Sequence, residues 1–419
     1  MRLLQINPVV RINTSTGRIM QEIANLASQH GWECYIAYSK GRDGLRGCGT
    51  QIVPVGNRIS TAWHGVVTRF FDCHGLASSG ATRQFIKEIE RIKPDVVHIH
   101  NIHGYFLNYK LLFQYLSKTK IHVVWTAHDC WLYTGHCYHY SFAKCNKWQT
   151  HCGKCPQRKE FPASYFIDRS WQNFEDKKLA FTSIPQDRFT IVAVSHWIRE
   201  EMAKSFLKNC RFCVIRNGID LELFNVCETD IVRQKYGLLG KHIILGVASI
   251  WMPEKGWGDF MKLSAMINDD EVIVLVGVKD AQRANLPSNI IPISKTENIR
   301  QLAELYSAAD VFVNPTWQDN YPTVNLESIA CGTPVVTYKT GGSVESVTEE
   351  TGVIVDQGDV NGLLHAIRLI ESRGKGYYRN NCRQYAMHNF NKVNCYSEYL
   401  DLYKSLVLNT SQHENTTIR

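Results

Sequence analysis

The sequence contains no run of about 18 or more apolar residues, so it predicts no helix that spans a bilayer. Its first residues, MRLLQINPVV, include only a short apolar stretch and no small-residue cleavage site, so we expect no signal peptide and a cytoplasmic location. In a reducing cytosol the 14 cysteines are expected to be thiols, core residues or metal ligands instead of disulfides. No Gly-x-Gly-x-x-Gly follows the first apolar stretch, which argues against an NAD-dependent oxidoreductase.

The net charge of +8 is distributed unevenly along the chain. Residues 1–210 contain 27 Lys and Arg against 15 Asp and Glu, whereas residues 211–419 contain 20 against 24, so the halves carry +12 and −4. A basic half of this kind indicates an anionic partner. Because the sequence has no helix-turn-helix, zinc-finger or base-stacking pattern, we expect no nucleic acid and favour an anionic membrane face or a phosphorylated acceptor.

A length of 419 residues exceeds what a single hydrophobic core usually supports and predicts two domains. Apolar stretches that alternate with helical periodicity recur in both halves, which is typical of doubly wound α/β domains that bind ligands at the carboxyl ends of their strands. The predicted strands are residues 3–6, 34–38, 96–99, 121–125, 190–194, 243–247, 272–276, 311–313 and 334–337. The predicted helices include one from Ile19 to Ala27, one capped by Ser195, and residues 256–266, 299–307, 324–330, 377–388 and 396–406.

The predicted boundaries place an N-terminal domain at residues 1–215 and a C-terminal domain at residues 216–390. A polar stretch from Glu222 to Lys241 is interpreted as the linker between them. A helix over residues 391–408 is expected to pack back on the N-terminal domain. The polar residues 409–419 are expected to form a disordered tail.

The most informative segment is NPTWQDNYPTVNLESIACGTPVV, residues 314–336. It predicts a strand, a loop that contains Asp319, and a helix with Asn320 as its N-cap and Pro322 in its first turn. The free N–H groups of such a helix terminus can bind phosphate. Glu327 lies on this helix, where its carboxylate can accept two hydrogen bonds from a ribose diol.

This segment resembles the acidic-x7-Glu motif of retaining family-4 glycosyltransferases. The resemblance implies the GT-B fold, in which two Rossmann-like domains face a central cleft. It also implies that Asp319 contacts the donor sugar hydroxyls and Glu327 the ribose. Many members have Glu at the first position, so Asp319 reaches less far by one methylene. The donor-binding residues predicted beside Glu327 are Asn320, Tyr321, Pro322, Thr323, Gly341, Gly342 and Ser249.

Lys255 follows the predicted strand 243–247 and precedes Gly256. The family resemblance implies that a Lys-Gly here contacts the donor diphosphate, with an Arg several residues earlier. This chain has Ser249 or Ile250 at the Arg position, so the diphosphate is expected to depend more on Lys255 and on helix N–H groups. The nucleotide, UDP or GDP, stays open. Because the sequence contains no Asp-x-Asp, we expect no catalytic metal or other catalytic cofactor.

In the first half, His128 follows the predicted strand 121–125, so its imidazole is expected at a ligand-binding edge. With Lys255 and Asp319 it completes the predicted catalytic set, whose members position substrate and stabilise charge. The alternative is that His128 has a structural role, since the chain contains 16 histidines. Four other residues of the first half are predicted to face the acceptor: Gly17, Asn101, His103 and Tyr105. His98 and His100 alternate along one strand and should share one face.

Four cysteines gather in a polar and aromatic stretch, residues 130–160, that has little apolar periodicity: Cys137, Cys145, Cys152 and Cys155. The spacing Cys152-Gly-Lys-Cys155 is typical of zinc knuckles, so we predict a closed structural zinc site. Two disulfides and free thiols remain alternatives, and His136, His139 or His151 can replace one ligand. The stretch HDCWLYTGHC, with its spaced cysteines and CGKCP, resembles the colanic-acid, O-antigen and capsular branch of the family.

The resemblance implies a retaining hexosyltransferase that moves a sugar from a nucleotide-diphosphate sugar to a lipid-linked saccharide, for a bacterial O-antigen, lipopolysaccharide, capsule or exopolysaccharide. The N-terminal domain is expected to bind the acceptor and the C-terminal domain the donor. The enzyme is expected to be peripheral at the anionic inner face of the cytoplasmic membrane. The alternatives are another GT-B enzyme, such as a sugar phosphorylase or epimerase, and a non-catalytic sugar-binding or scaffold protein.

Overall fold

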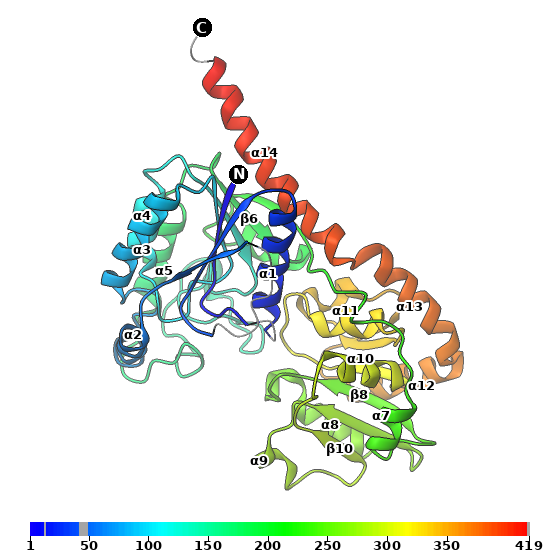
Figure 1. Cartoon of the computed structure of the whole chain (residues 1–419). Helices are drawn as coiled ribbons and strands as arrows, with labels where there is room; N and C mark the ends of the chain where they lie inside the picture. The colour runs from blue at the N-terminus through cyan, green and yellow to red at the C-terminus, as the bar shows by residue number, and fades with distance from the viewer. Residues whose placement is uncertain (12–13, 42–48, 417–419) are drawn as a thin grey trace. The chain divides into compact units, whose positions relative to one another are not determined.

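The computed structural model describes residues 1–11, 14–41 and 49–416, with side chains up to Leu408. Contacts divide the chain into two compact units (Figure 1). The first unit consists of Met1–Arg216 together with the chain from Tyr396 onward, and the second of Asn217–Cys395. Among the described residues, no helix combines the length and the apolar character needed to cross a bilayer.

The first unit is built on a seven-stranded parallel sheet with the order β3-β2-β1-β4-β5-β6-β7. The strands are β1 (Arg2–Ile6), β2 (Glu33–Tyr38), β3 (Gln51–Pro54), β4 (Val96–Ile99), β5 (His122–Ala127), β6 (Phe189–Ala193) and β7 (Arg211–Val214). The inner strands are buried along their whole length because helices cover both faces, which explains their nearly continuous apolar sequences.

The helices of this unit are α1 (Ser15–Gln29), α2 (Arg58–Phe71), α3 (Ser79–Ile92), α4 (Tyr109–Leu116), α5 (Ser170–Phe181), α6 (His196–Ala203) and most of α14 (Lys392–Thr416). Figure 1 shows α1 on one side of the sheet and α3, α4 and α5 on the other. Strand β5 illustrates the alternation: the Thr126 hydroxyl meets the Tyr399 hydroxyl of α14 at 3.1 Å, whereas the Trp125 ring packs on Phe181 of α5.

The second unit has a six-stranded parallel sheet with the order β10-β9-β8-β11-β12-β13. Its strands are β8 (His242–Val247), β9 (Glu271–Val276), β10 (Ile290–Ile293), β11 (Val311–Asn314), β12 (Val335–Tyr338) and β13 (Gly352–Val355). Its helices are α7 (Asp230–Lys235), α8 (Trp257–Ser264), α9 (Asp280–Arg283), α10 (Ile299–Ala308), α11 (Thr323–Ala330), α12 (Val360–Arg373) and α13 (Lys375–Asn389), with the short 3-10 helices η2 (Pro253–Lys255) and η3 (Gly341–Ser346).

The expected architecture of two Rossmann-like parallel α/β domains is confirmed. Each predicted strand is present within one or two residues, and Ser195 caps α6 by accepting a hydrogen bond from the Ile198 N–H. The sequence patterns missed β3, β7, β10 and β13, which lie at or next to sheet edges, and also the helices α2 to α5 and α12. Part of the stretch that was predicted to be a linker forms α7.

Disorder of residues 409–419 stays a prediction, and helix α14 continues to Thr416. Its sequence contains neither Gly nor Pro after Lys392, so nothing in it interrupts the backbone hydrogen bonds. The helix begins at Lys392, inside the range 391–408 that was expected to be helical. From Tyr396 it belongs to the first unit, where the Tyr403 hydroxyl contacts His98 Nδ1 at 2.6 Å.

Candidate functional site

In the second unit, the loops that follow β8, β11 and β12 are joined to one another at the carboxyl edge of the sheet. The Trp317 N–H donates to the Glu254 carbonyl at 2.8 Å, and the Gly342 N–H donates to the Asp319 carbonyl at 3.2 Å. At Gly341 the φ angle is +52°, and a Cβ atom would lie 2.0 Å from the Asp319 carbonyl oxygen. Only glycine permits this approach, which holds Asp319 in place.

Lys255 and Asp319, which the sequence predicted as two parts of one site, form a direct ion pair. The Lys255 Nζ donates to Asp319 Oδ2 at 2.8 Å, although the residues are 64 positions apart. Their side chains are 34% and 20% exposed. A cation and a carboxylate therefore meet at the ligand-binding edge of the sheet and remain partly accessible to a ligand.

Glu327 lies on α11, the helix that follows Asp319 in the chain, and is 4% exposed. Its Oε2 accepts a hydrogen bond from the Tyr306 hydroxyl at 3.2 Å. The predicted helix start needs a correction. The N-cap residue is Pro322 and not Asn320, because Pro322 has extended backbone angles (ψ 116°) and the first helical residue is Thr323. The N-cap side chain accepts no hydrogen bond, so it does not cover the N–H groups of the first turn.

A buried polar network that the sequence patterns did not predict supports this edge. It centres on Asn325, whose amide joins β11, α11 and η3: Asn314 donates to its Oδ1 at 2.8 Å, and its Nδ2 donates to the Ser343 and Ser346 hydroxyls at 3.2 and 3.0 Å. The Thr337 hydroxyl lies 2.7 Å from that of Ser343. The signal was available in the segment itself, since an Asn inside an otherwise apolar helix face must find buried partners.

The remaining donor-site candidates differ in exposure. Asn320 and Tyr321 are buried at 3% and 4% exposure, and Pro322 and Gly342 are buried as well. Thr323 is half-buried, and Ser249 is exposed in the loop after β8.

In the first unit, a chain of hydrogen bonds at the carboxyl ends of β1, β4 and β5 determines which ring nitrogen of His128 carries the proton. The Gln5 amide nitrogen donates to the Met20 carbonyl at 2.9 Å, so its Oε1 accepts from His100 Nε2 at 2.9 Å. In a neutral ring, His100 Nδ1 is then the acceptor for His128 Nε2–H at 3.0 Å. Burial lowers the pKa of His128 to about 4, so the ring is neutral and its Nδ1 carries a lone pair.

His98 and His100 share one face of β4, as predicted, with ring centroids 4.0 Å apart. Burial holds both pKa values well below the usual range. Beside them, His103 Nε2 contacts Asp129 Oδ2 at 2.6 Å and Asn101 Oδ1 at 3.1 Å. Burial works against ionisation of Asp129, but His103 and the backbone N–H of Trp131 outweigh it and lower the pKa of this carboxyl group.

Two acceptor candidates lie outside this cluster. Gly17 is buried in α1, and a Cβ atom there would lie 2.4 Å from the Arg11 carbonyl oxygen, so its small size serves contact with the chain's own loop. Residues 12 and 13, which precede α1, lie outside the described residues. Tyr105 adopts a φ angle of +61° and lines a separate cavity of about 550 Å³.

The four predicted zinc ligands line one small cavity of about 20 Å³, together with His136. The Gly135 N–H donates to Cys152 Sγ at 3.2 Å. A hydrogen bond from the Cys137 thiol lowers the pKa of Cys155. The stretch also has an aromatic core, which the sequence analysis did not foresee: the Trp148 ring lies 5.0 Å from that of Tyr133 and 4.7 Å from that of Tyr140.

The cysteines share a cavity without being drawn into a closed tetrahedron. Within the described part of the chain, only one group of three potential ligands has its ligand atoms within 4.8 Å of one another, and it consists of His242, Glu271 and Glu371. The residue types and the cavity suit a zinc ion, whereas the thiol positions require adjustment around one. Structural zinc therefore stays a prediction.

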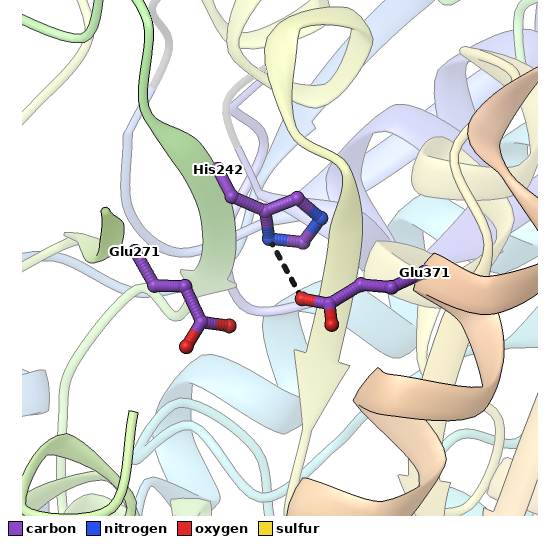
Figure 2. Close-up of side chains that lie close together, drawn as sticks. All are labelled: His242, Glu271 and Glu371. Atoms are coloured by element: carbon purple, nitrogen blue, oxygen red, sulfur yellow. Dashed lines mark ion pairs between the residues drawn. The ribbon is translucent and has the colours of Figure 1, made fainter. Parts of the chain in front are cut away.

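Figure 2 shows that other group, at the amino ends of β8 and β9, with His242 Nδ1 3.2 Å from Glu371 Oε1. Both carboxylates are already paired with Arg368, whose guanidinium donates to Glu271 at 2.6 Å and to Glu371 at 2.8 Å. This network lies at the sheet edge opposite to Lys255. It anchors α12 to the sheet, since Arg368 of that helix pairs with Glu271 of β9.

Two family comparisons cover most of the chain. Residues 16–223 match the family described as Glycosyltransferase Family 4, and residues 241–372 match the family described as Glycosyl transferases group 1. A putative colanic acid biosynthesis glycosyl transferase of Escherichia coli, WcaC, is 24% identical over 372 residues, which cover 86% of this chain and 88% of WcaC.

Solved structures share the fold along nearly the whole chain. Sucrose-phosphate synthase from Thermosynechococcus elongatus superimposes with a TM-score of 0.72 at 17% identity, covering 97% of this chain and 99% of that one. HepE from Anabaena, solved in complex with UDP and glucose, has a TM-score of 0.67 at 16% identity and covers 97% of this chain and 100% of its own. These likenesses confirm the expected GT-B fold class.

Proposed function

Because the chain belongs to the glycosyltransferases, with a Family 4 region followed by a group 1 region, we propose that it transfers a sugar from a nucleotide-diphosphate sugar to a saccharide acceptor with retention of the anomeric configuration. The observation that carries this proposal is the Lys255–Asp319 ion pair beside the start of α11, with Glu327 on the same helix. The pair joins two of the charged residues that the sequence predicts for the donor site, and the third follows Asp319 on the adjacent helix.

Each of these groups has a chemical role in the proposal. Lys255 and the first N–H groups of α11 bind the donor diphosphate, whose two phosphates need a cation and hydrogen-bond donors. Asp319 accepts hydrogen bonds from the sugar hydroxyls, and Glu327 accepts them from the ribose. The binding of UDP and glucose by HepE, which shares the fold, supports a nucleotide-sugar donor.

In the transfer, the bond between the sugar C1 and the diphosphate oxygen breaks and a bond from C1 to the acceptor oxygen forms on the same face. The acceptor hydroxyl proton passes to the leaving diphosphate. Lys255 stabilises the charge that develops on that leaving group. His128 is neutral with its proton on Nε2, so it accepts a hydrogen bond from a substrate hydroxyl through Nδ1 and does not act as a general acid.

The likeness to WcaC supports a role in the biosynthesis of a bacterial surface polysaccharide. We propose a lipid-linked saccharide as the acceptor and the anionic inner face of the cytoplasmic membrane as the place of work. The basic first half of the chain, with +12 over residues 1–210, supports both.

The test is a transfer assay with the full-length protein and a panel of UDP-sugars and GDP-sugars, preceded by thermal unfolding with UDP, GDP and NAD. We expect one nucleoside diphosphate to raise the unfolding temperature and its sugar to be transferred, with the anomeric configuration of the first product determined by NMR. Stabilisation by none of them indicates a scaffold, transfer only from a sugar phosphate indicates a phosphorylase, and an inverted product contradicts retention.

A further inference from the structure

Helix α2 has its polar side inward and its apolar side outward. The residues that it buries are small or polar: Thr61, His64, Gly65 and Thr68. His64 is held by the Ser78 hydroxyl at 2.9 Å and by the Gly75 N–H at 3.0 Å. The outward residues are apolar, with Ile59 80% and Trp63 63% exposed. A water-soluble domain normally has the opposite arrangement, so this face indicates a partner.

A neighbouring loop extends the apolar face. The Phe166 ring stacks on the Phe70 ring at 4.9 Å, and the Tyr165 N–H donates to the Arg69 carbonyl at 2.8 Å, which ties the loop to α2. The apolar patch, by which we mean the exposed side chains of α2 and this loop, consists of Ile59, Trp63, Val66, Phe70, Phe71, Phe161, Tyr165, Phe166 and Ile167, each between 42% and 80% exposed.

A basic cavity adjoins the patch. It has a volume of about 550 Å³ and is lined by Lys40, Arg58, Arg69 and Tyr105, with Thr61, Ala62 and Gly65 of α2 among the other lining residues. In the part of the chain that the structure describes, no carboxylate forms an ion pair with any of the three cations. The Tyr105 ring connects cavity and patch, since its centroid lies 5.9 Å from the Arg69 guanidinium and 6.1 Å from the Phe161 ring.

We propose that this cavity and patch bind the lipid carrier of the acceptor: a polyprenyl diphosphate, with its diphosphate among Lys40, Arg58 and Arg69 and its hydrocarbon chain along the exposed face of α2. The inference rests on the proposed function and names the substrate class and the surface that receives it. Charge complementarity selects this occupant. Three cations suit a diphosphate, and the apolar residues begin where the cavity ends, as the two halves of an amphiphile require.

A protein partner would fit these observations less well. Protein interfaces are depleted in charge at their core, whereas here a basic cavity large enough for a diphosphate opens beside the aromatic side chains. On an amphipathic surface that lies at a membrane interface, aromatic rings enter the acyl boundary and cations remain at the phosphates.

The experiment measures binding of the full-length protein to phosphatidylcholine vesicles that contain either a polyprenyl diphosphate or phosphatidylglycerol at equal charge. We expect stronger binding to the polyprenyl diphosphate vesicles. The double variant Arg58→Gln/Arg69→Gln should weaken it at least about tenfold, and so should Ile59→Ser/Phe166→Ser. All four positions are exposed, so these variants should unfold at the wild-type temperature.

Matched controls lie elsewhere on the molecule. Ile231 on α7 is 79% exposed, against 80% for Ile59, and Ile231→Ser should bind as the wild type does. Arg83→Gln/Lys87→Gln on α3 removes two exposed charges without touching the cavity and should also bind normally. Equal binding to both kinds of vesicle, or equal losses in the controls and the patch variants, overturns the proposal.

A second measurement separates this inference from the proposed function. With a water-soluble diphosphate-linked saccharide as acceptor, Ile59→Ser/Phe166→Ser should retain transfer, because the hydrocarbon chain is absent. If the wild type transfers to the soluble acceptor but binds neither kind of vesicle, the lipid surface is refuted and the proposed function stands. If no nucleotide sugar is used with any acceptor, the proposed function itself fails.

Discussion

Replacing Lys255 by methionine removes the cation of the Lys255–Asp319 pair while keeping much of the side chain's length. The pair is partly exposed, at 34% and 20%, so its contribution to folding is at most about 1 kcal/mol. Its proposed contribution to catalysis is larger. A charge-assisted hydrogen bond to a diphosphate oxygen contributes about 1.5–3 kcal/mol, which corresponds to a roughly ten- to 150-fold loss in kcat/KM.

The assay measures kcat/KM for the nucleotide sugar, inhibition by the free nucleoside diphosphate, and thermal unfolding. Lys255→Met should weaken both substrate use and binding of the nucleoside diphosphate. Asp319→Asn should reduce transfer but leave binding of the nucleoside diphosphate largely intact, because Asp319 is assigned to the sugar and not to the phosphates. This difference between the two variants tests the assignment of roles more sharply than either loss alone.

Lys262 provides the matched control. It lies in the adjacent helix α8, is 70% exposed, and pairs with Asp259 at 3.9 Å. Lys262→Met should therefore leave kcat/KM unchanged. The reasoning is refuted if Lys255→Met stays within about threefold of the wild type, or if Lys262→Met loses as much activity.

Three further predictions concern metals and pH. Protein purified without a metal-binding tag should contain about one zinc per chain; less than about 0.2, with the thiols of Cys137, Cys145, Cys152 and Cys155 titrating freely, contradicts the structural site. Transfer should persist in excess EDTA, and an absolute need for added Mg²⁺ or Mn²⁺ contradicts the proposed diphosphate binding by Lys255. Burial lowers the pKa of His64 and His128 to about 4. Below about pH 6.5 both residues therefore become protonated in the unfolded state but stay neutral in the folded state. The free energy of unfolding should therefore fall by about 2 kcal/mol for each of these residues between pH 7 and pH 5, and urea unfolding of His64→Gln, with a smaller pH dependence than the wild type, checks the sign.

The sequence determined the architecture and the charged residues of the donor edge because both depend on local patterns. Apolar runs in parallel strands are buried on both faces, so the inner strands are visible in the sequence. Edge strands such as β3 and β7 are partly exposed, and they carry no such signal. The acidic-x7-Glu spacing placed Asp319 and Glu327 relative to one helix, and a family resemblance supplied Lys255.

Tertiary structure alone decided three features, because each depends on residues that are distant in the sequence. The ion pair between Lys255 and Asp319 arises where β8 and β11 lie side by side in the sheet. Burial keeps His128 neutral, and its tautomer follows from hydrogen bonds that run back through His100 to Gln5, 123 positions earlier in the chain. The outward apolar face of α2 has ordinary helical periodicity, and only the burial of Thr61, His64, Gly65 and Thr68 shows that the polar side is the one that packs on the domain. Periodicity reports that a helix has two faces, but the surrounding chain determines which of them meets water.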